Sequence, residues 1–331
     1  MNNKFIKNKT FFITGGTGTL GKALVSKIKS NGGKVVIFSR DEGKQALFFG
    51  QDSEIVRIIG DIRDYDKLNV SIMRSKPDVI IHTAALKRID DMEFYPDECV
   101  KTNIQGSENV AKAAFNNKVN KCILISTDKA CQPVNVYGSS KFIAERIFTN
   151  YDYFSDHTIF SSVRYGNVLC SRGSFIPLWL SLLNDNKKIK VTSLEMTRFL
   201  FTINDAVDTV LGAVKHSEGG EVFIPQIPSY GMNTILQAIE KINTNGKILF
   251  DEIGLRPGEK LHEDMLALTE LPFTYKVKDV NLLCVRPQYT KRKYKKEWKK
   301  YKGTHFNSSL HVSDNVEELV KLINRGTLES E

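Results

Sequence analysis

A tyrosine and a lysine follow an acid–base pair in the stretch ISTDKACQPVNVYGSSK, residues 125–141. Tyr137 and Lys141 would face the same way on a helix, because residues i and i+4 are neighbours on a helix surface. A phenol is a poor base at neutral pH, but a nearby ammonium group and a positive nicotinamide lower its pKa. Tyr137 could then take a proton from an alcohol, while the Thr127 hydroxyl bonds the same oxygen.

A glycine-rich loop near the N-terminus predicts where a dinucleotide binds. The loop lies between an apolar run at 10–14 and a helical stretch at 22–30. The N–H groups and the positive dipole end of a helix attract a pyrophosphate, and glycines let it approach the backbone. We therefore expect cofactor contacts from Gly15, Thr17, Gly18, Thr19, Leu20 and Gly21.

The end of the second apolar run distinguishes NADP from NAD. An NAD site typically has a carboxylate there that bonds the ribose 2′-hydroxyl, whereas a guanidinium suits a 2′-phosphate. Arg40 therefore favours NADP, and Asp41 keeps NAD as the alternative. The contacts expected from this region come from Ser39, Arg40, Asp41 and Lys44. After the third run, Asp61 and Ile62 are placed to hold the adenine edge, with a helix cap or turn as the alternative for Asp61.

The elements that must position these residues alternate between apolar runs and helical segments. The apolar runs lie at 10–14, 34–39, 56–61, 78–82 and 121–126. Apolar strands separated by helices indicate a parallel sheet that is covered on both faces. We predict an α/β fold with a doubly wound parallel-sheet Rossmann domain in residues 1–166, to which segments of about 198–225 return. Residues 167–331 are predicted to form mainly a smaller, irregular α/β lobe that binds substrate.

Composition restricts the class of protein. The 331 residues are 41% hydrophobic and 26% charged, which is ordinary for a globular protein with a full core. No apolar run approaches the roughly 18–20 residues of a membrane span. Five cysteines and six histidines show no metal or disulfide spacing, so we expect a cytoplasmic protein without a metal site. The net charge of +9 includes the basic segment 291–302, which lacks a nucleic-acid motif; we interpret it as a solvated helix face or a mobile tail.

The glycine loop, Thr127 and the motif at 137–141 together resemble the extended short-chain dehydrogenase/reductase superfamily. Sugar-nucleotide 4-epimerases of this superfamily only remove and return hydride, whereas dehydratases also need an acid at the 6-hydroxyl and a base at C5. Asp128 and Lys129 directly after Thr127, followed by Tyr137, look like the inverting UDP-N-acetylglucosamine 4,6-dehydratases; retaining dehydratases typically carry Asp-Glu there. Further stretches that match the same family are 84–87, 101–103, 164–168, 171–174, 196–199 and 254–263.

The resemblance implies a mechanism in which bound NADP is regenerated in each turnover. Tyr137 would deprotonate the C4 hydroxyl of UDP-N-acetylglucosamine, Lys129 would remove the C5 proton, and Asp128 would protonate the departing 6-hydroxyl. Lys129 then requires a lowered pKa and Asp128 a raised one. Cofactor contacts would also come from Ala84, Ala85, Lys87 and Asn103. Substrate contacts would come from Lys87, Thr127, Asn167, Arg198, Arg256 and Glu259.

Other functions remain open as alternatives. A UDP-hexose or UDP-N-acetylhexosamine 4-epimerase would have no use for the Asp128–Lys129 pair, and a catalytically silent NADP-binding regulator would have no use for Thr127, Tyr137 and Lys141. Tyr137 favours the pseudaminic acid branch, because membrane-bound and capsule-type relatives often have methionine there. The superfamily also implies a homo-oligomer that pairs through long helices, without nucleic acid or membrane.

Overall fold

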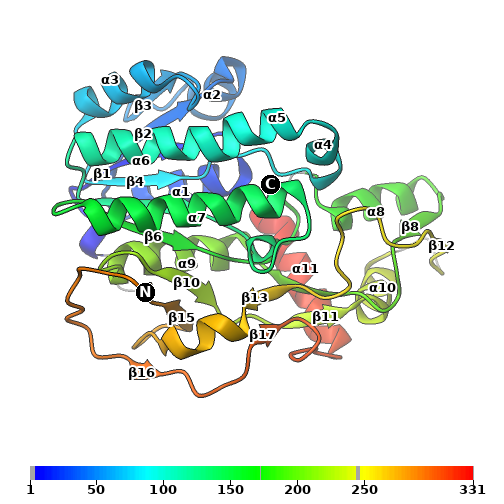
Figure 1. Ribbon diagram of the computed structural model, residues 1–331. Coiled ribbons are helices and arrows are strands. Elements are labelled where there is room, and N and C mark those ends of the chain that lie inside the picture. Colours follow the sequence, from blue (N-terminus) through cyan, green and yellow to red (C-terminus); the bar gives the residue numbers. More distant parts are fainter. Residues whose placement is uncertain (1–3, 172, 244–246, 331) are drawn as a thin grey trace.

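The structure is a computed structural model, and it describes residues 4–171, 173–243 and 247–330. Position 172, inside the matched stretch 171–174, lies outside the described residues. At the centre is a ten-stranded sheet (Figure 1) with the order β16-β14-β15-β10-β6-β5-β4-β1-β2-β3. The strands are β1 (Thr10–Thr14), β2 (Lys34–Ser39), β3 (Ile55–Ile59), β4 (Val79–His82), β5 (Lys121–Ile125), β6 (Ile159–Val163), β10 (Val222–Pro225), β14 (Thr274–Lys276), β15 (Leu282–Val285) and β16 (Lys299–Lys300).

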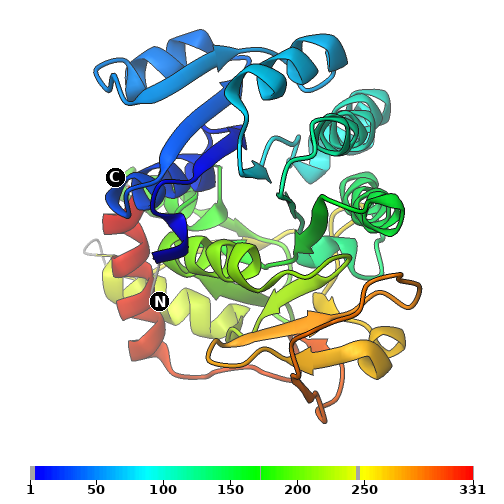
Figure 2. The ribbon, with the colours of Figure 1, turned by 90° about the vertical axis from the view of Figure 1, so that its left-hand side faces the viewer.

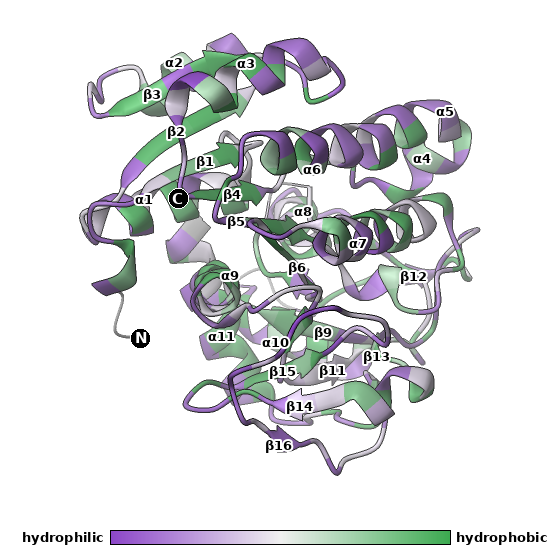
Figure 3. Cartoon of the chain, turned by 60° about the vertical axis from the view of Figure 1, so that its left-hand side comes forward, coloured by the Kyte–Doolittle hydropathy of each residue, from purple (hydrophilic) through white to green (hydrophobic). Residues whose placement is uncertain are grey.

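Helices cover both faces of this sheet, as Figure 2 shows. One face packs against α3 (Tyr65–Ser75), α6 (Gly106–Asn116) and α7 (Val136–Phe154); the other packs against α1 (Thr19–Ser30), α2 (Glu42–Phe49) and α9 (Ile203–His216). Successive strand residues alternate between these layers, so that Phe12 packs with α6 and α7 and Ile13 packs with α1 and α9. Figure 3 shows the resulting hydrophobic interior. The strands from β3 to β10 are parallel, which confirms the predicted fold class.

Smaller sheets and three helices form a second lobe, most of which packs around a core of its own. The sheets are β7 (Asn167–Val168) with β9 (Thr197–Phe201) and β11 (Ser229–Gly231), β8 (Ile189–Val191) with β12 (Phe250–Glu252), and β13 (Asp264–Leu266) with β17 (Phe306–Asn307). The helices are α8 (Phe175–Asn184), α10 (Met232–Ile242) and α11 (Val316–Ser330). Of the returning segment 198–225, α9 and β10 join the main body, whereas β9 stays in the lobe. The sequence analysis places β14, β15 and β16 in the lobe, but they extend the main sheet by antiparallel pairing.

Short helical turns complete the chain. They are η1 (Lys4–Ile6), α4 (Ile89–Phe94), α5 (Pro96–Cys99), the π-helical turn η2 (Val100–Gln105), η3 (Asp128–Ala130) and η4 (Leu268–Phe273). Within the described parts of the chain, no helix has both the length and the apolar composition to cross a membrane. The same residues hold no group of His, Cys, Asp and Glu side chains suited to a metal ion.

The basic segment 291–302 is neither a helix face nor a loose tail, so that interpretation is wrong. Arg292 pairs with Asp152 at the end of α7, with 3.1 Å between Nη2 and Oδ1. Lys296 Nζ donates to the carbonyl of His216 at the end of α9, at 2.6 Å. Residues 299–300 form β16, and the guanidinium of Arg286 lies over the rings of Tyr275, Tyr294 and Trp298. Carbonyls, carboxylates and aromatic rings elsewhere in the fold therefore bind this charge run to the edge of the sheet.

Candidate active site

The glycine loop after β1 has no room for larger residues. Gly15 has a φ of +70°, and a Cβ on it would lie 2.8 Å from the nitrogen of Ala84. A Cβ on Gly21 would lie 2.5 Å from the Gly15 carbonyl oxygen. Gly18 precedes α1, and among the described residues no side chain caps the N–H groups of that helix end. The loop therefore fits a pyrophosphate, which needs close backbone approach and unoccupied amides.

The two charged residues after β2 have different surroundings. Asp41 caps α2: its Oδ1 accepts a hydrogen bond from the Lys44 backbone N–H at 2.9 Å, and its Oδ2 pairs with the Lys44 side chain. Arg40 has a side chain that is 56% exposed and lies 3.6 Å from Asp61. Burial raises the pKa of Asp61, but hydrogen bonds from Arg63 outweigh burial and hold this pKa below its usual value. Of these two residues, Arg40 therefore has the charge that is more available to a ligand at this strand end.

Asn103 shapes the loop that follows β4. Its side chain is fully buried in η2, where Oδ1 accepts from the Leu86 N–H at 2.8 Å and Nδ2 donates to the Leu86 carbonyl at 2.9 Å. Nδ2 also donates to Ser140 of α7 at 3.0 Å. The amide therefore joins the 84–87 loop to α7, and a direct contact of Asn103 with a cofactor stays a prediction.

Thr127, Asp128 and Lys129 come together with Tyr137 because α7 starts directly against η3. A Cβ on Gly138 would lie 2.3 Å from the Lys129 carbonyl oxygen, so only glycine permits this approach. Asn135 caps α7 by accepting from the Gly138 N–H at 2.6 Å. The Thr127 hydroxyl donates to Asp128 Oδ1 at 2.8 Å and accepts from the Lys129 backbone N–H at 3.4 Å.

The protonation of the tyrosine–lysine pair differs from the expectation. Desolvation raises the pKa of Tyr137 to about 12, and the cation that lowers it most is Lys129 rather than Lys141. Burial lowers the pKa of Lys141 to about 8 against the opposing charge of Glu145. The expected lowering of the Tyr137 pKa is therefore wrong for the chain by itself, because the desolvation of the phenolate outweighs its cationic neighbours.

Lys129 lies between two carboxylates. Its Nζ is 3.0 Å from Asp128 Oδ1 and 3.4 Å from Glu263 Oε1, and it also donates to Asn167 Oδ1 at 3.4 Å. Burial lowers the pKa of Lys129 and Arg198 lowers it further, but the two carboxylates outweigh both and raise it above its usual value. The expectation of a lowered Lys129 pKa is wrong for this reason. Lys129 is an ammonium group that is held by its acid neighbours.

Each of the two carboxylates has one oxygen buried without a hydrogen-bond partner among the described residues, Asp128 Oδ2 and Glu263 Oε2. Such atoms cost free energy unless a ligand or water satisfies them, and they mark where a polar group is expected to bind. The sequence analysis missed a role for Glu263. It matched the stretch 254–263 to a family, but only the fold shows that this carboxylate reaches Lys129.

A buried ion-pair network lies beneath the acid–base pair. Arg164, which is 1% exposed, pairs with Glu145 of α7 at 2.7 Å and with Glu270 of η4 at 2.9 Å. Ser126, at the end of β5, donates to Glu145 at 2.6 Å. This network connects β5, β6, α7 and the lobe, so it fixes the position of η3 relative to the catalytic helix.

The predicted substrate residues separate into two places. Arg198 is buried, and its guanidinium donates to the carbonyls of Lys260 and Leu261, each at 3.0 Å, beside Lys129. Arg256 is half-exposed and pairs with Asp90 at 3.0 Å and with Glu259 at 3.9 Å. Asn167 lies with Lys129 and Arg198, whereas Arg256 and Glu259 lie on the exposed 254–259 loop. Contacts of any of these residues with a nucleotide stay predictions.

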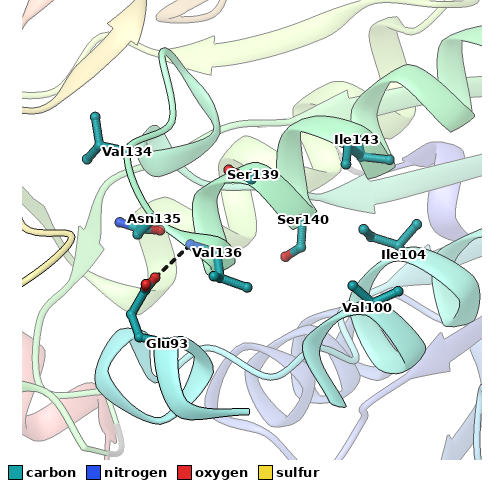
Figure 4. A pocket seen from close by; sticks show the side chains of 9 residues that line it. All are labelled: Glu93, Val100, Ile104, Val134, Asn135, Val136, Ser139, Ser140 and Ile143. Carbon is teal, nitrogen blue, oxygen red and sulfur yellow. Dashed lines mark hydrogen bonds between the residues drawn. The ribbon is translucent and has the colours of Figure 1, made fainter. Parts of the chain in front are cut away.

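A hollow of about 380 Å³ lies beside the start of α7 (Figure 4), and neither Tyr137 nor Lys141 lines it. Glu93 enters it from α4 and accepts a hydrogen bond from the Val136 N–H at 2.7 Å. The remaining lining residues are Val100, Ile104, Val134, Asn135, Val136, Ser139, Ser140 and Ile143. This hollow is separate from the acid–base pair.

Comparisons with known proteins agree with this arrangement. Residues 11–283 match the family model described as "Polysaccharide biosynthesis protein". The protein named UDP-N-acetylglucosamine 4,6-dehydratase (inverting) of Campylobacter jejuni serotype O:23/36 is 42% identical over 279 residues, 81% of this chain and 80% of that protein. A Rickettsia bellii protein named UDP-glucose 4-epimerase is 40% identical over 277 residues, 80% and 79% of the two chains. The X-ray structure of Pen from Bacillus thuringiensis superposes with a TM-score of 0.90 at 37% identity, over 98% of this chain and 99% of that one.

Proposed function

The chain belongs to the polysaccharide biosynthesis protein family, and from this premise we propose that it is an inverting UDP-N-acetylglucosamine 4,6-dehydratase. The observation that carries the proposal is the buried contact of 3.0 Å between Lys129 Nζ and Asp128 Oδ1, beside Tyr137. Elimination of water needs an acid and a base on neighbouring carbon atoms, and this pair supplies both. Epimerisation at C4 alone would use neither, although several relatives bear the name UDP-glucose 4-epimerase.

The cofactor proposed is NADP. Supporting observations are the glycine loop without side-chain bulk, the N–H groups at the start of α1, and the exposed Arg40 beside an Asp41 that caps its own helix. When bound, a nicotinamide would accept hydride from C4 and return it to C6. The cofactor residues named from the sequence lie at the carboxyl edge of the parallel strands, where such ligands bind.

The chain's own residues then move the protons. Tyr137 takes the proton of the C4 hydroxyl, and Thr127 bonds the same oxygen. Transfer of one proton from Lys129 Nζ to Asp128 across their 3.0 Å contact would create the neutral base and the protonated acid together. Lys129 then removes the C5 proton, and Asp128 gives its proton to the 6-hydroxyl, which leaves as water. Reprotonation of C5 from the opposite face, by Tyr137, gives the inverted L-arabino sugar.

The nucleotide half of the substrate is assigned to the exposed loop. Arg256 offers a guanidinium at the surface, where it can bind phosphate oxygens in a bidentate manner once it leaves Asp90. Glu259 accepts from the Arg256 N–H at 3.2 Å and so holds this loop in shape. We also propose that the chain forms a homo-oligomer and that its reaction is the first step in the synthesis of pseudaminic acid or a related 6-deoxy-amino sugar.

The test is incubation with UDP-N-acetylglucosamine in heavy water, followed by mass spectrometry and NMR. The expected product has lost one water, carries deuterium at C5 and shows a C6 methyl group with the L-arabino configuration. A product of unchanged mass identifies an epimerase, and no conversion of any UDP-sugar identifies a regulator. Either outcome overturns the proposal.

A further inference from the structure

Glu263 is a charged neighbour of Lys129 that the proposed mechanism does not use. It is 2% exposed, its Oε1 lies 3.4 Å from Lys129 Nζ, and its Oε2 is buried without a partner among the described residues. A buried carboxylate is costly unless it is paired, and here its charged neighbour is the same ammonium group that pairs with Asp128. One buried cation therefore serves two buried anions.

The backbone around Glu263 is held rigidly. Its N–H donates to Ser308 Oγ at 2.8 Å, and its carbonyl accepts from the Ser308 N–H at 2.8 Å. Arg198 binds the carbonyls of Lys260 and Leu261, which lead into this residue. Two independent segments thus fix where the Glu263 carboxylate lies, so its contact with Lys129 is set by the fold and not by a mobile surface chain.

We propose that Glu263 is a positioning residue of the acid–base pair: its carboxylate holds Lys129 against Asp128, and its negative charge retains protons on both. This inference rests on the proposed function. The proton that Asp128 gives to the departing hydroxyl must stay on a carboxyl group at working pH. A second carboxylate at the same ammonium opposes the ionisation of Asp128, because like charges in one site disfavour the charged form.

The groups around Lys129 come from four segments. From η3 and α7 come Asp128 and Tyr137, from β9 comes Arg198, and from the segment before β13 comes Glu263. Other charged or titratable groups on that last segment are engaged elsewhere: Lys260 donates to the Cys131 carbonyl at 2.9 Å and lies 3.7 Å from Asp264, and His262 bonds Thr197 at 2.8 Å. Removal of the Glu263 charge is therefore a change at Lys129 and Asp128 in particular.

The experiment is the pH–rate profile of water loss from UDP-N-acetylglucosamine for the holoenzyme and for Glu263→Gln. The neutral side chain removes a negative charge beside Lys129, so the Asp128–Lys129 pair should lose its protons more easily and both limbs of the profile should move to lower pH, by about 1 to 3 pH units. The variant would then retain activity at acidic pH where the wild type has lost it. The neighbouring carboxylate gives the matched control: Asp264→Asn should leave both limbs in place.

Glu263→Asp provides a second test if the glutamine variant does not fold. It retains the charge but draws it back from Nζ, so its limbs should shift in the same direction by a smaller amount. If Glu263→Gln folds and both limbs of its pH–rate profile stay in place, the inference is overturned and only a packing role is left. If Glu263→Gln does not fold, unchanged limbs in Glu263→Asp overturn the inference in the same way. A wild-type enzyme that releases no water overturns the proposed function instead, so the two failures are distinguishable.

Discussion

The Cβ that Gly138 lacks would lie 2.3 Å from the carbonyl oxygen of Lys129. The first turn of α7, which carries Tyr137, therefore packs directly on η3, the turn that carries Asp128 and Lys129. A backbone contact of this kind leaves no flexible side chain to move aside. The spacing between the proposed oxidation base and the proposed elimination base depends on it.

Gly138→Ala should separate the two bases. The added methyl group overlaps a backbone oxygen, so we expect a loss of about 1–3 kcal/mol in the free energy of unfolding and a strong decrease in water loss. Denaturant unfolding and product analysis measure the two effects. In the control Gly43→Ala, the nearest atom to the new Cβ is Asp41 Oδ1 at 3.6 Å, so stability should not fall. Equal stabilities of the two variants would contradict the close packing.

Lys129→Ala should abolish water loss while the cofactor stays bound. Removal of a general base typically costs about 10²- to 10⁴-fold in rate. Lys129→Arg is the sharper variant, because it keeps a cation near Asp128 and Glu263 but guanidinium is not deprotonated in proteins. We expect it to be inactive yet more stable than the alanine variant. Rapid turnover by Lys129→Arg, measured by mass spectrometry, would exclude Lys129 as the base.

Lys141→Met should stabilise the cofactor-free protein at neutral pH. The folded-state pKa is lowered from 10.5 to about 8, so the unfolded chain binds more protons between these values and the wild type gains stability as pH rises through them. Below about pH 8 the buried charge costs on the order of 3 kcal/mol, which methionine avoids. The stability gap should close between about pH 8 and 10.5. The exposed control Lys34→Met should show no such dependence, and a pH-independent gap for Lys141→Met would contradict the assignment.

Arg40→Ala should weaken NADP binding far more than NAD binding. A hydrogen bond to a charged group contributes about 1.5–3 kcal/mol, which corresponds to about a 10- to 100-fold loss in affinity for the 2′-phosphate. Calorimetric titration of the cofactor-free protein with each dinucleotide measures the ratio. Equal losses for the two cofactors would place the 2′-phosphate elsewhere.

Local sequence patterns predicted the roles of residues that lie close together in the chain. They did not predict the roles of residues that only the fold brings together. The glycine loop belongs to one strand–helix unit and the Tyr137–Lys141 spacing belongs to another, so each can be recognised from a short stretch of sequence. Glu263 and Arg164 contribute through partners that only the folded chain brings near. Spacing also says nothing of desolvation, which raises the pKa of Tyr137, or of the distant Glu263 carboxylate, which together with Asp128 raises the pKa of Lys129. The directions expected for these two pKa values were wrong for these reasons.

The basic segment 291–302 limits how far the C-terminal part of this chain can be shortened. The family match ends at residue 283, before the basic segment. This segment supplies the outer strand β16. It also supplies the cation that pairs with Asp152, which is 2% exposed and lies near the end of α7. A chain that ended at residue 283 would leave the buried Asp152 carboxylate without its cation. It would also expose the edge of β14 to pairing with other molecules. Residues 291–302 are therefore integral to the fold, and a shortened version of this protein has to keep them.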